Sequence, residues 1–251
     1  MRLDPGFYAR PFAHRALHGP GAPENSREAI AAAVAGGWGI EIDVQATEDG
    51  APFVFHDYGL ERLTGRKGTV QTTRAADMAT IPLLGGPTAA PTLTEVLDMV
   101  AGQVPLLIEI KDQDGALGTK IGGLQDAVAS ALDGYDGPVA LMSFNPHAAL
   151  ALRPTGRPIG ITSCNYVAED WPTIPAATRR DLAEIPHLDQ VDFLSHQWDE
   201  LDSPAVARAK SAGKPVFCWT IRDQAQADTA RQVADQITFE GFYPGLTACA
   251  P

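Results

Sequence analysis

Short apolar runs alternate along the chain with Ala-rich stretches in which apolar residues recur every three or four positions. The short β-branched runs predict strands, and the longer periodic stretches predict amphipathic helices. We expect strands near residues 11–15, 38–44, 105–110, 138–143, 158–162, 191–195, 214–220 and 235–239. We expect helices near residues 25–36, 92–102, 120–133, 146–152, 175–185, 203–212 and 222–233.

Start and stop signals support several of these helices. Asn25-Ser26 precedes the first helix and Gly36-Gly37 ends it, while Ser203-Pro204 places proline in a first helical turn. Eight strands separated by helices predict an α/β fold, a (β/α)₈ TIM barrel, and a chain of 251 residues suits one such domain over residues 1–251. A doubly wound sheet is the alternative, but that fold often carries a Gly-rich first turn and no GxGxxG is present.

Residues 57–91 break the alternation, because they are rich in Gly, Thr and Pro. We interpret them as a short insertion after the second strand, with one short helix near residues 74–79. Long irregular segments inside compact domains are usually either functional or disordered.

Acidic side chains stand inside two of the predicted strands. Side chains alternate along a strand, so Glu41 and Asp43 in GIEIDVQ share one face and the apolar residues between them share the other. The segment LLIEIK repeats the pattern with Glu109 and Lys111. In a barrel the apolar face packs against helices, so we expect all three carboxylates to point into the lumen, near its top.

Three carboxylates that converge where solvation is poor would repel one another. A bound divalent cation removes that cost, and carboxylate oxygens favour Mg²⁺ or Ca²⁺, with Mn²⁺ also compatible. A solvated strand face, or a Glu–Lys ion pair without a ligand, is the alternative. The repetition on two strands favours the cation.

Histidines end two of the apolar runs. His14, followed by Arg15, and His56 are expected at the C-terminal rim, where TIM-barrel active sites form. Two histidines beside a cation and an arginine suit acid–base chemistry at phosphorus, in which one assists the attacking oxygen and the other protonates the leaving alkoxide. His196, at the end of the sixth strand, is a further candidate for the pocket, whereas we interpret His18 as a loop residue.

The charge and cysteine content of the chain indicate which binding partners and which cellular compartment to expect. The formal net charge of −12 disfavours nucleic acid and anionic membrane surfaces, so an anionic substrate must be neutralised locally. No apolar run reaches the length of a membrane span and no signal peptide is visible, so we expect no stable membrane insertion. Three widely spaced cysteines, Cys164, Cys218 and Cys249, suggest reduced thiols and a cytoplasmic protein.

An ordered set of motifs resembles the glycerophosphodiester phosphodiesterase family over nearly the whole chain. The motifs are His14-Arg15, Pro23-Glu24-Asn25-Ser26, Glu41-Ile42-Asp43, Asp49-Gly50, His56-Asp57, Leu63-Thr64-Gly65, Pro91-Thr92-Leu93, Ile108-Glu109-Ile110-Lys111, Ser143-Phe144-Asn145-Pro146 and Cys218-Trp219-Thr220. The resemblance implies a TIM barrel with an insertion after the second strand and one divalent cation on Glu41, Asp43 and Glu109. It also implies His14 and His56 as the acid–base pair, and Arg15 and Lys111 as contacts to the phosphate.

Two positions depart from the family pattern. Ala16 stands where glycine is usual after His-Arg, and Phe239-Glu240 stands where a Thr-Asp pair is usual. Neither change removes a proposed ligand or acid–base residue. Glu240 and Trp219 are candidates for the substrate pocket, although a tryptophan in a barrel strand needs no function. Glu24 either helps to cap the first helix or supports the site from behind.

The residues predict a metal-dependent phosphodiesterase, and the resemblance implies hydrolysis of glycerophosphodiesters to sn-glycerol 3-phosphate and an alcohol. We favour His56 as the acid. Attack by water and attack through a cyclic phosphate both remain open, as does the oligomeric state. The alternatives are a phospholipase D-like phosphodiesterase acting on lipids and a non-catalytic barrel that binds a phosphorylated ligand.

Overall fold

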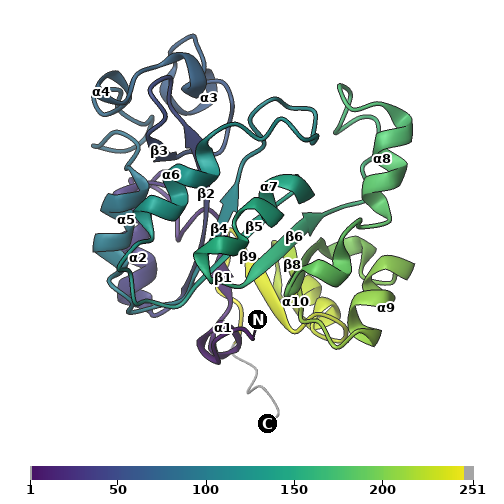
Figure 1. Cartoon of the computed structure of the whole chain (residues 1–251). Helices are drawn as coiled ribbons and strands as arrows, with labels where there is room; N and C mark the ends of the chain where they lie inside the picture. Colours follow the sequence, from purple (N-terminus) through teal and green to yellow (C-terminus); the bar gives the residue numbers. More distant parts are fainter. Residues whose placement is uncertain (1, 246–251) are drawn as a thin grey trace.

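A computed structural model describes residues 2–245 of the chain. Eight parallel strands close into a barrel, because β1 pairs with both β2 and β9. The strands are β1 (Phe12–Ala13), β2 (Gly39–Ala46), β4 (Leu106–Ile110), β5 (Val139–Ser143), β6 (Ile159–Ser163), β7 (Phe193–Gln197), β8 (Val216–Ile221) and β9 (Gln236–Phe239). The closed barrel confirms the predicted TIM fold and excludes the open doubly wound sheet (Figure 1).

All seven predicted helices are present, each inside its expected range. They are α2 (Arg27–Gly36), α5 (Leu93–Val100), α6 (Leu124–Ala131), α7 (Pro146–Ala151), α8 (Ala176–Ala183), α9 (Pro204–Ser211) and α10 (Gln224–Ala230). The start signals act as expected: the Ser26 hydroxyl accepts the backbone N–H of Ala29, and Ser203 caps α9 in the same way. α2 ends at Gly37, whose φ of 66° is left-handed and suits glycine.

One short strand that the sequence did not predict lies between the second barrel strand and the insertion at residues 57–91. Residues of β3 (Pro52–Val54) pair antiparallel with the end of β2, and this three-residue strand is too short to show a period in the sequence. Beyond it lie α3 (Glu61–Thr64), η1 (Val70–Thr72) and α4 (Ala75–Met78), of which only α4 was expected. The insertion and the hairpin strand before it share a small separate core, formed by Phe53, Phe55, Leu60, Leu63, Val70, Met78, Ile81, Leu83 and Ala90.

The remaining short helices are α1 (Gly6–Ala9), η2 (Arg153–Thr155), η3 (Leu188–Gln190) and η4 (Trp198–Glu200). α1 lies at one end of the barrel, while the insertion and the α8 segment rise on either side of the opposite end (Figure 1). That opposite end is the C-terminal rim of the strands.

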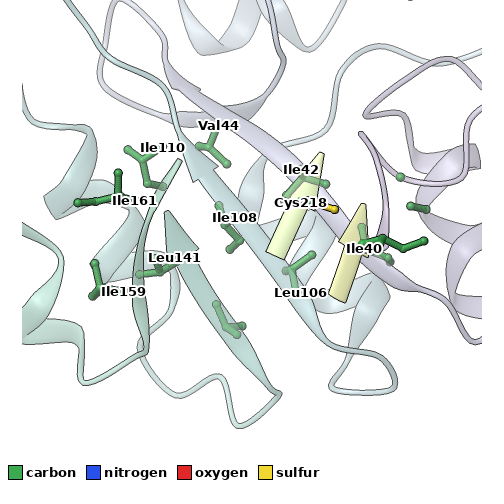
Figure 2. Close-up of a cluster of buried hydrophobic side chains, with 14 of the residues drawn as sticks. Ile40, Ile42, Val44, Leu106, Ile108, Ile110, Leu141, Ile159, Ile161 and Cys218 are labelled. Carbon is green, nitrogen blue, oxygen red and sulfur yellow. The ribbon is translucent and has the colours of Figure 1, made fainter. Parts of the chain in front are cut away.

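The two faces of each strand bury different side chains. The outward face carries the aliphatic layer beneath the helices, including Ile40, Ile42, Val44, Leu106, Ile108, Ile110, Leu141, Ile159 and Ile161 (Figure 2). The lower lumen is filled by an aromatic and aliphatic layer: Leu3, Phe7, Phe12, Leu107, Ala140, Met142, Phe193 and Phe217. Gly160 is required in that layer, because a Cβ there would lie 2.3 Å from the Phe193 ring. Polar side chains therefore gather in the upper lumen.

No helix within residues 2–245 is long and apolar enough to cross a membrane. Cys164 and Cys218 are buried free thiols, and Cys249 lies outside the described residues.

Candidate active site

Three carboxylates meet in the upper lumen, as the strand alternation predicts. Asp43 of β2 is the register partner of Glu109 of β4, and Glu41 stands one inward position below Asp43. The three residues are 3%, 2% and 6% exposed for Glu41, Asp43 and Glu109, and one oxygen from each lies within 4.8 Å of the others. These buried oxygens form a candidate site for a divalent cation.

Two basic side chains lie against this acidic cluster. The Lys111 ammonium lies 2.7 Å from Asp43 Oδ1 and 2.6 Å from Glu109 Oε1. Arg15 donates its backbone N–H to Glu41 Oε2 at 2.9 Å, and its guanidinium Nε lies 3.8 Å from Asp43 Oδ2. Three carboxylates against two cations leave one net negative charge when all are ionised.

The environment shifts the pKa values of the cluster in opposite directions. Burial, reinforced by the charges of Asp43 and Glu109, raises the pKa of Glu41 well above its usual range. Burial would also raise the pKa of Asp43, but Lys111 and the other nearby cations outweigh it and lower that pKa. Burial opposes the charge of Lys111, yet Asp43 and Glu109 raise its pKa. Hard oxygen donors with residual negative charge fit a divalent cation.

Each of the two rim histidines is held by a carboxylate. His14 Nδ1 lies 2.9 Å from Glu240 Oε2, and His56 Nδ1 lies 2.7 Å from Asp57 Oδ1. The hydrogen bond from His14 is the main reason that the pKa of Glu240 falls to about 2, so this carboxylate is ionised and accepts the bond at neutral pH. The Nδ1 proton is thereby fixed, and Nε2 is the ring nitrogen left for chemistry.

Burial lowers the pKa of His14, although its bond to Glu240 opposes the shift. Burial would raise the pKa of Asp57, but hydrogen bonds from His56 and Arg62 lower it. His14 is therefore neutral near pH 7, whereas the carboxylates that hold the two histidines, Glu240 and Asp57, are charged.

Arg62 is a central residue of the site that sequence reasoning missed. It lies in α3 of the insertion and donates to both oxygens of Asp57, at 2.6 and 2.7 Å, and to both oxygens of Glu24, at 2.7 Å each. Glu24 in turn accepts a 2.9 Å bond from Arg15. Arg62 thus links the carboxylate behind His56 to the one behind Arg15. The only sequence signal was its place two residues before the Thr64-Gly65 turn.

The three residues before α2, Glu24 to Ser26, make different contacts. Ser26 caps the helix, whereas Glu24 supports Arg15 and Asn25 Nδ2 donates to Asp43 Oδ2 at 3.0 Å. Of the two interpretations of Glu24, support of the site from behind is the one that its contacts favour.

Two connected cavities occupy the rim. The smaller, about 180 Å³, is lined by His14, Arg15, the three carboxylates and the inward-facing Thr162, Ser195 and Thr238. The larger, about 720 Å³, extends from there under the rim loops. The two share His56, Glu109, Lys111, Phe144, Trp219, Thr220 and Arg222. Lys111 and His56 therefore stand where the two cavities meet.

His196 does not belong to the pocket, contrary to the expectation. Its neighbour Ser195 faces the lumen, so the alternation of β7 turns His196 outward, where Nδ1 lies 2.7 Å from Ser163 Oγ. Burial lowers the pKa of His196 to about 4, which keeps it neutral. Glu240 lies behind His14 and beside Arg222 Nη1, at 3.1 Å, and lines neither cavity. Trp219 lines both cavities.

This fold and this site chemistry are those of a TIM-barrel hydrolase. The glycerophosphoryl diester phosphodiesterase family matches residues 14–236, which is most of the chain. The chain belongs to the glycerophosphoryl diester phosphodiesterase family.

Among individual relatives, the chain is similar to a glycerophosphodiester phosphodiesterase of Bacillus altitudinis, with 32% identity over 150 residues. It is 35% identical over 150 residues to the Bacillus subtilis protein YqiK. Each match covers 56% of this chain and 60% of the relative.

Two solved structures share the fold. A phosphodiesterase of Oleispira antarctica, in complex with the product sn-glycerol-3-phosphate, matches with a TM-score of 0.73 and 26% identity over 92% of both chains. A glycerophosphodiester phosphodiesterase of Thermotoga maritima matches with a TM-score of 0.69 and 20% identity, over 91% of this chain and 92% of that one.

Proposed function

We propose that this protein hydrolyses glycerophosphodiesters to sn-glycerol 3-phosphate and an alcohol. The observation that carries the proposal is the convergence of three buried carboxylates, two cationic side chains and two carboxylate-bound histidines in one small cavity. The family membership and the product bound in the Oleispira antarctica relative support the same substrate class.

The negative phosphodiester binds against fixed positive charge. Arg15 and Lys111 line the smaller cavity beside the acidic cluster, which supports a role for their donors in binding the non-bridging oxygens. Glu41, Asp43 and Glu109 would hold one divalent cation, which supplies charge stabilisation for the phosphoryl oxygens when bound. The cluster's net charge of one negative, a divalent cation and a monoanionic diester together sum to zero.

The histidines divide the proton transfers. Burial keeps His14 neutral in the smaller cavity, which suits a base that accepts the proton of the attacking oxygen at Nε2. His56 lines both cavities and so borders the space available to the alcohol, which suits an acid that protonates the departing alcohol. Glu240 and Asp57 hold the two rings in orientation through Nδ1.

The test is the release of sn-glycerol 3-phosphate from a panel of water-soluble glycerophosphodiesters. The protein is treated with EDTA and then supplied with Mg²⁺, Ca²⁺ or Mn²⁺. We expect release that disappears with EDTA and returns with at least one ion. Absence of release from every diester with every ion would refute the proposal. Release from phospholipid vesicles but from none of the soluble diesters would instead favour a phospholipase-type activity.

A further inference from the structure

The larger cavity has walls of a different character from the catalytic one. Its accessible lining is mostly apolar, and the apolar part comes from Tyr58, Phe144, Trp171, Trp198 and Trp219 together with Leu117 and Cys164. We call this larger cavity the aromatic bay. Its volume of about 720 Å³ is four times that of the smaller cavity, and it opens directly past His56. It is therefore the space into which the alcohol half of a bound diester would extend.

The aromatic wall is built and braced by packing. The Phe144 ring lies 5.5 Å from Trp219 and 5.2 Å from Trp171, and Trp171 lies 5.2 Å from the buried ring of Tyr166. These residues come from the ends of β5 and β8 and from the loop after β6. A wall of mutually packed rings presents fixed π surfaces rather than hydrogen-bonding groups.

The unpaired charge around the bay is negative. Two of its cations are balanced by carboxylates: Lys111 lies against Asp43 and Glu109 at the catalytic end, and Arg222 pairs with Glu240. Asp170 and Asp199, by contrast, line the bay and have no ion-pair or hydrogen-bond partner within residues 2–245. An aromatic cavity with free carboxylates at its mouth attracts cations.

We propose that the aromatic bay is a subsite for a cationic alcohol, specifically one that carries a quaternary ammonium group. This inference rests on the function proposed above. Such a group has no hydrogen-bond donors to satisfy, so apolar rings suit it, and its charge is attracted to their faces and to Asp199. Anionic alcohol groups would meet the free carboxylates, and polyhydroxylated groups would find few polar partners on the rings. The bay thereby sets the preference among glycerophosphodiesters.

Binding is tested first without catalysis. Choline and its neutral isostere 3,3-dimethylbutan-1-ol have the same shape and differ in charge, and each is titrated against the metal-loaded protein by calorimetry. We expect choline to bind on the order of tenfold more tightly. Equal affinities, or no saturable binding of either compound, would overturn the proposal.

Catalysis then provides an independent readout. We expect kcat/KM for glycerophosphocholine to exceed that for glycerophosphoglycerol by roughly tenfold. Trp171→Leu and Asp199→Asn should each reduce this ratio severalfold, whereas Trp171→Phe should keep most of it because a ring remains. Asp202→Asn is the matched control, since Asp202 is exposed near Asp199 but does not line the bay. A ratio near one in the unsubstituted protein, or a ratio unchanged in both Asp199→Asn and Trp171→Leu, would overturn the subsite.

The two proposals fail separately. If no glycerophosphodiester is hydrolysed, the proposed function fails, while choline binding still decides whether the bay recognises a cation. If diesters are hydrolysed without regard to the charge of the alcohol, the function stands and the subsite fails.

Discussion

Arg62 offers the sharpest test of how the insertion serves the site. Replacement by methionine keeps much of the volume but removes four hydrogen bonds of 2.6 to 2.7 Å, two to Asp57 and two to Glu24. Asp57 would no longer be fixed behind His56, and Glu24 would no longer be fixed behind Arg15. Both effects fall on groups to which the proposed function assigns a role at the substrate.

The magnitude follows from exposure and from the role of the partners. The Arg62 side chain is 48% exposed, so solvent screens its ion pairs and their loss should cost about 1 kcal/mol of stability or less. In a chain of this length that corresponds to a fall in Tm of no more than about 4 °C. Removing residues that orient site groups typically costs about 10–100-fold in activity. We therefore expect a large loss of kcat/KM beside a small loss of stability.

The assay measures kcat/KM for a soluble glycerophosphodiester and Tm by calorimetry on the same metal-loaded samples. Arg66→Met is the matched control, because Arg66 lies in the same insertion and its guanidinium pairs with no carboxylate in residues 2–245. Arg62→Lys should recover only part of the activity, since one ammonium cannot reach both carboxylates as a fork does. Activity of Arg62→Met within twofold of the unsubstituted protein would refute the reasoning, and so would a loss of activity fully explained by unfolding.

Three further predictions address the groups in the smaller cavity. His14→Ala and His56→Ala should each lower kcat by at least about a hundredfold, and near-normal turnover in either variant would remove that residue's role. Glu41→Gln should weaken the binding of Mg²⁺ or Ca²⁺ in calorimetric titration, and an unchanged dissociation constant would take Glu41 out of the ligand set. Because burial lowers the pKa of His14, this ring stays neutral, and active as a base, below its ordinary pKa of about 6.5. The acid limb of the pH profile of kcat/KM should therefore fall below that value, and an acid limb above it would contradict His14 as the base.

The part of the site that lies on regular strands could be predicted from the sequence. The period of two in GIEIDVQ and LLIEIK separates Ile40, Ile42, Ile108 and Ile110 from the carboxylates, and the structure places Glu41, Asp43 and Glu109 together on the inward face as expected. His14 and His56 could be placed at the rim because each ends an apolar run. His196 could not, because the direction of a side chain at a strand end depends on register, and one residue decides between lumen and outer layer.

What the sequence by itself determined is therefore local: the alternation of strands and helices, the helix caps, and the acidic inward faces that follow from strand period. Only the tertiary structure decided that Arg62, 38 residues from Glu24, joins two carboxylates behind the site, and that Phe144, Trp171 and Trp219 meet in one wall. The physical reason is that periodicity reports which face of an element is buried, whereas these contacts join separate loops whose paths depend on the packing of the whole barrel.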